Sequence, residues 1–97
     1  MESPTLQHDV QRTIDVYEQI IGHAASRTRT MIEQLGAVEA LSRLVVSSDL
    51  QPGFKALRDR GRLNESFEAV VTRHPDAFRP DVVEAAQWRL NTADKPR

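Results

Sequence analysis

The sequence predicts an all-α fold in which a long N-terminal helix packs on a compact bundle of three to four shorter helices. Apolar residues recur at spacings of three and four, the period of a helix. Gly or Pro follows most of these periodic segments, as expected at helix ends, and no segment alternates as a strand does. Because the chain has 97 residues, we expect one domain, residues 1–97, around one continuous core.

The first helix is expected within residues 1–35. Ser3 can cap its free amides and Pro4 suits a first helical turn. Its apolar stripe consists of Val10, Ile14, Tyr17, Ile21, Ala24, Thr28, Met31 and Leu35. Written as heptads, these residues occupy the two seam positions that face a partner helix.

One straight helix over this stretch would be about 45 Å long, whereas a compact domain of this size has a radius of gyration of about 13 Å. The stretch therefore either projects and pairs with a second copy or another protein, or folds back at residues 22–26, where Gly22 weakens the helix. The period crosses Gly22 without a phase shift, which favours one helix with at most a kink. Whether the seam packs within the chain or against a partner stays open.

The compact part is expected in residues 36–91. Gly36 ends the first helix, and Ala37–Val46, apolar over most of its circumference, should be the most buried helix. Three further helices are expected at residues 49–60, 64–73, with Asn64 as cap, and 80–91, opened by Pro80. Phe78 should fill the core from a loop, and residues 92–97 should form a loose tail.

Composition narrows the function classes. The formal net charge is −1, so no overall excess of charge indicates a nucleic-acid or membrane partner. The absence of cysteine excludes disulfides and thiolate metal sites. No apolar run approaches the ~18 residues of a membrane span, and no signal sequence precedes the first helix. We expect a cytoplasmic protein without a membrane partner.

Catalytic and metal-binding patterns are not found in the sequence. His8 and His23 would be more than 20 Å apart on one straight helix, and the His8–Asp9 pair lacks the further ligands of a metal site. His74 precedes Pro75 and is expected to interact with helix-terminal carbonyls. We expect no enzyme activity, no cofactor and no bound metal.

A basic cluster consists of Lys55, Arg58, Arg60 and Arg62. It is either a solvated surface or a phosphate-binding patch. Residues 37–46 and 49–60 also have the lengths of a helix-turn-helix, whose second helix would then read the nucleic acid.

Trp88 lies opposite the apolar stripe of the last helix. It either packs against the first helix, which we favour, or stands exposed as an interface anchor, a role in which tryptophan is enriched.

Two thirds of the chain resembles a known pattern. The matching segments are residues 31–40 with Arg43 and Leu44, 48–57 with 61–63, 66–71, and 83–86 with Arg89 and Leu90. They resemble a small helical module of uncharacterised bacterial proteins, often C-terminal and sometimes encoded near mobile-element or defence genes. The resemblance implies an accessory role and brings no known activity.

The sequence thus predicts a non-catalytic protein-interaction or accessory module that dimerises with, recruits or inhibits another bacterial protein. Its expected contacts are Val10, Ile14, Tyr17, Ile21, Met31 and Trp88. The alternative is a nucleic-acid-binding helical protein that uses the basic cluster.

Overall fold

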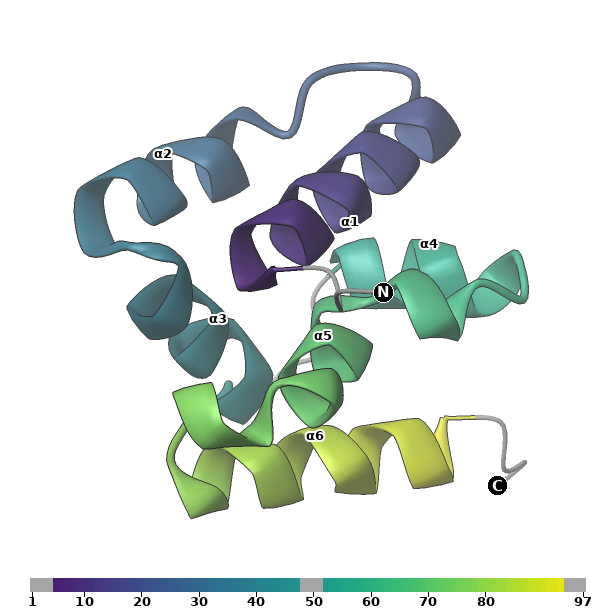
Figure 1. Ribbon diagram of the computed structural model, residues 1–97. Coiled ribbons are helices and arrows are strands. Elements are labelled where there is room, and N and C mark those ends of the chain that lie inside the picture. The colour runs from purple at the N-terminus through teal and green to yellow at the C-terminus, as the bar shows by residue number, and fades with distance from the viewer. Residues whose placement is uncertain (1–4, 48–51, 94–97) are drawn as a thin grey trace.

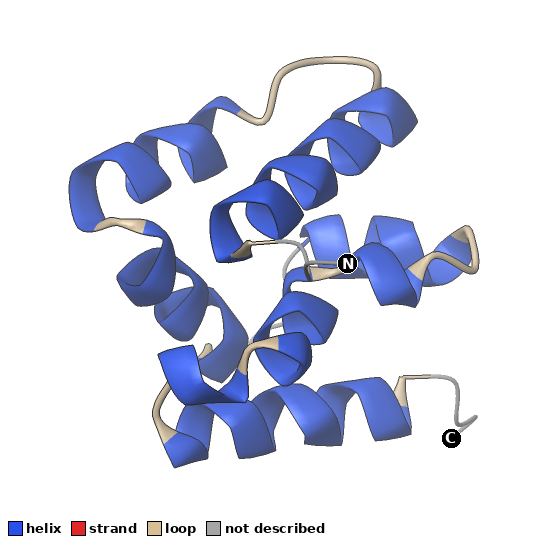
Figure 2. Ribbon diagram, in the orientation of Figure 1, coloured by secondary structure: helices blue, strands red, loops and turns tan. Residues whose placement is uncertain are grey.

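The computed structural model describes residues 5–47 and 52–93, and every element in these two ranges is helical (Figure 2). The expected all-α class is confirmed. The elements are α1 (Leu6–Ile21), α2 (Ser26–Leu35), α3 (Ala37–Val46), α4 (Pro52–Asp59), the 3₁₀ turn η1 (Leu63–Glu65), α5 (Phe67–Arg73), the 3₁₀ turn η2 (Pro75–Ala77) and α6 (Pro80–Thr92). The Cα radius of gyration is 12.7 Å, so the N-terminal region does not project as a separate rod.

The N-terminal stretch forms two helices, so the prediction of one long helix over it is wrong. α1 ends at Gly22, whose φ of 80° is left-handed and whose N–H donates to Glu18 O at 2.9 Å. In Figure 1 the chain then crosses the top of the molecule and returns as α2. Glycine adopts this conformation without the steric cost that a Cβ brings. The helix can therefore end at Gly22 although the heptad pattern continues beyond it.

Helix starts differ from the predictions in two places. The cap of α1 is Thr5, whose hydroxyl accepts from the His8 N–H at 3.1 Å, while the expected start at Ser3 and Pro4 lies outside the described residues. Asn64 belongs to η1, and α5 starts three residues later, where the Ser66 hydroxyl accepts from the Ala69 N–H at 3.1 Å. The cap of α5 is therefore Ser66, two residues after the predicted Asn64.

The core lies where the first half of α1 meets α3, α5 and α6. Its buried apolar side chains are Val10, Ile14, Leu41, Val45, Val70, Val71, Phe78, Val82 and Ala86. The bounds of α3 agree with the prediction, and Phe78 enters the core from the residues between η2 and α6, as expected. α6 continues to Thr92, one residue into the expected tail, and residues 94–97 lie outside the described ranges.

A buried ion pair links α5, α6 and the end of α3. Arg89 Nη1 donates to Glu68 Oε2 at 3.0 Å and to Leu44 O at 3.1 Å, and Nη2 donates to Ser47 O. The guanidinium therefore satisfies carbonyls that the end of α3 leaves without helical partners. Burial raises the pKa of the Glu68 carboxyl, and the hydrogen bond from Arg89 opposes this shift.

None of the helices in the described part of the chain combines the length and apolar character needed to cross a bilayer.

Candidate functional site

A cavity of about 440 Å³ opens between the second half of α1, α2, α4 and the start of α5. Its large apolar lining residues are Ile14, Tyr17, Ile21, Met31, Leu44, Phe54, Leu57 and Phe67. Small-molecule and cofactor sites have volumes of about 300–1,000 Å³ and similarly apolar walls. The cavity is therefore large enough to take either a small ligand or a few side chains of another protein.

The heptad stripe of the sequence divides between the core and this cavity. Val10 and Ile14 are both 4% exposed and belong to the core, and Ile14 also borders the cavity. Tyr17, Ile21 and Met31 line the cavity and remain partly exposed. With Ile14, Ala24 and Thr28, six of the eight residues of the predicted stripe thus line one cavity.

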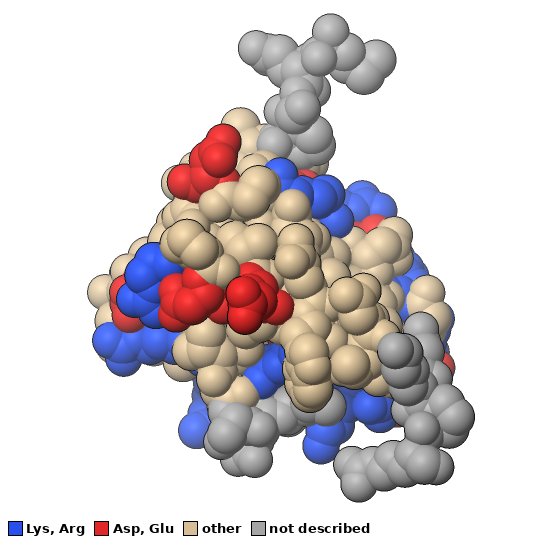
Figure 3. Space-filling view, turned by 90° about the horizontal axis from the view of Figure 1, so that it is seen from below, with Lys and Arg blue, Asp and Glu red and all other residues tan. Residues whose placement is uncertain are grey.

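Trp88 lies elsewhere, on α6. Its side chain is 65% exposed, so the favoured prediction that it packs against the first helix is wrong. The core-facing residues of α6 are Val82, Ala86 and Arg89, and the helical period turns Trp88 away from them. Figure 3, seen from the side on which α6 lies in Figure 1, shows a broad area without charged side chains, bordered by both acidic and basic ones.

The wall formed by α4 comes very close to α1. A Cβ built on Gly53 would lie 3.5–3.6 Å from the ring of Tyr17, which is ordinary van der Waals contact. The Tyr17 ring therefore lies over the first turn of α4, where the residue without a side chain leaves room for it. The pair closes one side of the cavity.

α2, which forms another wall, is attached to α1 mainly by an ion pair and hydrogen bonds. Packing contributes less, because no residue of α2 is buried. Glu18 of α1 accepts two hydrogen bonds from Arg29, at 2.8 and 2.7 Å, and one from the Ala25 N–H at 2.7 Å. The Arg29 guanidinium and then the Ala25 amide lower the pKa of Glu18 to about 2. Glu18 therefore holds both the connection between α1 and α2, through Ala25, and the start of α2, through Arg29, against α1.

The charge that the cavity presents to solvent is positive. Arg27, in the first turn of α2, is an exposed cation among its lining residues. Glu68 is the one carboxylate among its described lining residues, and it is 4% exposed and bonded to Arg89. Among the described residues, an occupant would meet a cation at the rim and no free carboxylate.

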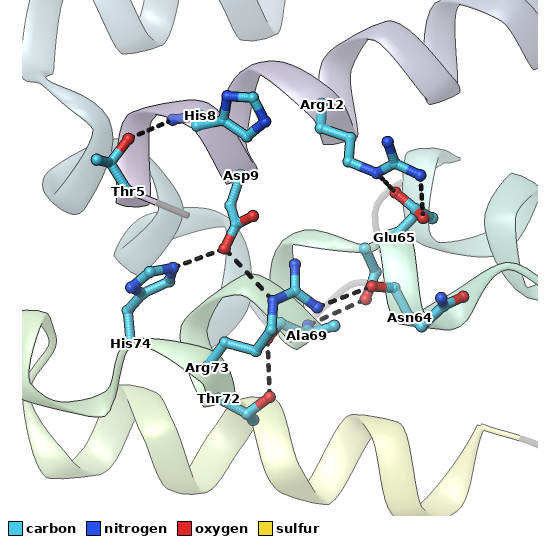
Figure 4. A network of polar contacts seen from close by, with 11 residues as sticks. Thr5, His8, Asp9, Arg12, Asn64, Glu65, Ala69, Thr72, Arg73 and His74 are labelled. Carbon is cyan, nitrogen blue, oxygen red and sulfur yellow. Dashed lines mark hydrogen bonds and ion pairs between the residues drawn. The ribbon is translucent and has the colours of Figure 1, made fainter. Parts of the chain in front are cut away.

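A second polar network fastens the first half of α1 to α5 and η1 (Figure 4). Asp9 Oδ2 is 2.7 Å from His74 Nε2 and accepts from Arg73 Nε at 3.4 Å. On the next turn, Arg12 makes two hydrogen bonds to Glu65, at 2.8 and 3.1 Å. Burial alone would raise the pKa of Asp9, but the hydrogen bond from His74 and the charge of Arg73 outweigh it and lower that pKa.

Sequence reasoning missed the contact between Asp9 and His74. His74 was expected to interact with helix-terminal carbonyls, and its backbone N–H does donate to Val70 O and Val71 O. Its imidazole instead contacts a carboxylate 65 residues away, a separation at which spacing carries no signal. Through this contact His74 ties the end of α5 to the first half of α1.

The basic cluster lies on α4 and the turn after it. Arg58 pairs with Asp59 at 3.2 Å, while Lys55, Arg60 and Arg62 are exposed and form no ion pair within the described residues. α4 packs on α1 and η1, and Figure 1 shows α3 and α4 on opposite sides of the molecule. The described parts of α3 and α4 therefore do not form the packed pair expected of a helix-turn-helix.

No protein-family model, curated protein or solved structure matches this chain. The resemblance to a bacterial helical module stays a prediction, and the functional argument depends on the geometry of the chain itself.

Proposed function

We propose that this chain is a non-catalytic protein-interaction module that dimerises with, recruits or inhibits another protein, and that the cavity beside α1 is its contact site. One observation carries the proposal. Ile14, Tyr17, Ile21 and Met31 belong to a single heptad stripe and line an open space. Seam residues are covered by a partner helix in helical assemblies, and here the chain's own helices cover only part of the stripe.

Two buried polar side chains of the cavity lining, Ser66 and Glu68, are already hydrogen-bonded within the chain. The Ser66 hydroxyl already donates to Leu63 O at 2.6 Å and accepts from Ala69. Glu68 is bonded to Arg89. Because these groups are satisfied within the chain, they have little hydrogen-bonding capacity left for a polar ligand.

Trp88 is the second contact in this proposal. Interface residues that carry most of the binding energy are enriched in tryptophan, and Trp88 is the most exposed of the large hydrophobic side chains that the structure describes, at 65%. It lies on α6, so a partner that reached both sites would have to contact two sides of the molecule.

A pair of neighbouring substitutions tests the cavity. Met31→Glu places a charge on its wall, and Thr30→Glu places the same charge on the exposed side of α2. We expect self-association, measured by light scattering across a hundredfold concentration range, or capture of a protein from a lysate, to be lost in Met31→Glu and kept in Thr30→Glu. Thermal unfolding should show that both variants fold.

Equal association by the wild type and both variants would show that the cavity is not the contact. A monomer that captures nothing at any concentration would contradict the interaction module itself.

Nucleic-acid binding is the second candidate, favoured by the exposed Lys55, Arg60 and Arg62, which form no ion pair with any residue that the structure describes. Phosphate contacts make affinity fall steeply with salt. A gel shift at low and at moderate salt should therefore show binding that weakens between the two conditions. No shift at low salt would remove this candidate.

A further inference from the structure

The cavity has the form of a trough between helices. Along α1, the lining residues Ile14, Tyr17 and Ile21 span seven positions, or about 10 Å and two helical turns. On α4, which contacts α1 through Gly53 and Tyr17, the lining residues Phe54 and Leu57 are three residues apart. Rows with spacings of three and four are the ridges and grooves into which another helix packs.

The volume limits what can enter this trough. About 440 Å³ accommodates a few side chains but not a whole helix, which is about 10 Å across. An occupant would therefore insert the side chains of one face and leave its backbone across the opening.

The rim adds a charge preference. Arg27 is exposed at the edge of the cavity. Arg29, two residues further on, is already neutralised by Glu18, and Glu68 by Arg89. Arg27 is thus the cation at the edge that no described carboxylate pairs with, and an acidic group on the occupant would complement it.

We propose that the occupant is an amphipathic helix of a partner protein, with apolar side chains at positions i, i+3 or i+4, and i+7 in the cavity and a Glu or Asp beside them against Arg27. This inference rests on the proposed function and names the chemistry of the partner. A second copy of this chain and a small apolar molecule are the other possible occupants, and the test separates them.

Two labelled peptides of about 15 residues, long enough for marginal helicity, serve as probes. Both carry Leu at i, i+4 and i+7. The peptides differ only beside these leucines, where one has Glu and the other has Lys. Binding to the full chain is followed by fluorescence anisotropy at low and high salt. The variants are Arg27→Glu and, as a control with the same change of charge, Arg60→Glu, an exposed residue outside the cavity.

We expect the Glu peptide to bind about fivefold more tightly than the Lys peptide at low salt, the upper range for an exposed ion pair. High salt should narrow the difference. Arg27→Glu should reverse the preference, and Arg60→Glu should preserve it.

Equal binding of the two peptides, or tighter binding of the Lys peptide, would overturn the acidic partner while leaving the interaction module in place. If neither peptide binds, helix docking in the cavity is wrong. The comparison of Met31→Glu with Thr30→Glu then decides separately whether the cavity closes against a second copy. Binding of a short aliphatic alcohol to the wild type when neither peptide binds would assign the site to a small molecule and overturn the inference.

Discussion

The two halves of α1 carry the same heptad pattern and have different surroundings. Asp9 and Val10 in the first half are buried against α5 and its neighbours, and Arg12 and Asp9 are held by ion pairs. Tyr17 and Ile21 in the second half line an open cavity whose outer wall, α2, has no buried residue. The pattern therefore defines which face of a helix is apolar, while the rest of the chain determines how much of that face is covered.

The largest effect is expected in the closed region. Arg89→Met would leave the buried Glu68 carboxylate without its cation, and losing one partner of a buried ion pair costs about 3–5 kcal/mol. Urea denaturation followed by circular dichroism should show this loss. Arg43→Met, which breaks an exposed pair with Glu39, is the matched control and should cost less than about 0.5 kcal/mol. Equal losses would mean that the buried pair contributes no more than a surface pair.

A core and a cavity substitution sharpen the comparison directly. Leu41 is 0% exposed, and Leu41→Ala should lower the free energy of unfolding by about 2–5 kcal/mol. Met31 is partly exposed on the cavity wall, and Met31→Ala should cost less than about 1 kcal/mol, because the side chain fills no closed space. If Met31→Ala costs as much as Leu41→Ala in the same urea titration, the cavity is closed in solution.

The attachment of α2 should depend on pH. The pKa of Glu18 is lowered from 4.5 to about 2 in the folded chain, so folding favours the carboxylate. Its contribution is complete above about pH 4.5 and is lost as the pH falls toward about 2. The amide resonances of Ser26–Leu35 should report this loss in the wild type.

Glu18→Gln should loosen α2 already at neutral pH, seen as faster amide exchange, and should remove the titration. Asp15→Asn is the control, because the wild-type Asp15 is on the same helix and lies 3.7 Å from Arg29. This variant should keep the slow amide exchange of α2 and its titration. A titration that persists in Glu18→Gln would contradict this assignment.

The smallest effect is expected at Trp88. Trp88→Ala removes a side chain that is 65% exposed, so unfolding free energy should change by less than about 0.5 kcal/mol. Phe78→Ala, at a position 7% exposed, should cost about 3–5 kcal/mol in the same assay. Melting of the domain by Trp88→Ala would place this tryptophan in the core and remove it from the proposed contacts.

Local signals in the sequence predicted much of the fold. Periodicity located the apolar faces, and Gly36 and the apolar circumference of residues 37–46 predicted the bounds of α3. The reversal after Ile21 was one of two alternatives, and the wrong one was favoured because periodicity does not register a left-handed glycine. The cavity itself was not predictable, since it depends on how far α2 and α4 stand from α1.

The ion pairs were beyond sequence reasoning for a related reason. Glu68 and Arg89 are 21 residues apart and Asp9 and His74 are 65 apart. In the sequence, each of these four residues resembles an ordinary solvent-exposed charged residue. Only the packing of the helices shows which residue is its partner. The favoured packing of Trp88 against the first helix was wrong for the same reason. Helical phase shows that Trp88 is opposite the stripe, but it does not show which element lies on that side.

The ties between α1 and α5 also have a consequence for synthesis. Asp9 can contact His74 only after the 65 residues that follow Asp9 have been synthesised. At ~5–20 residues per second, a ribosome needs roughly 3–13 s to add these residues. During that interval the apolar stripe of α1 is made but its covering helix is not. The nascent chain therefore presents this stripe to chaperones or to neighbouring nascent copies before it can close its own core.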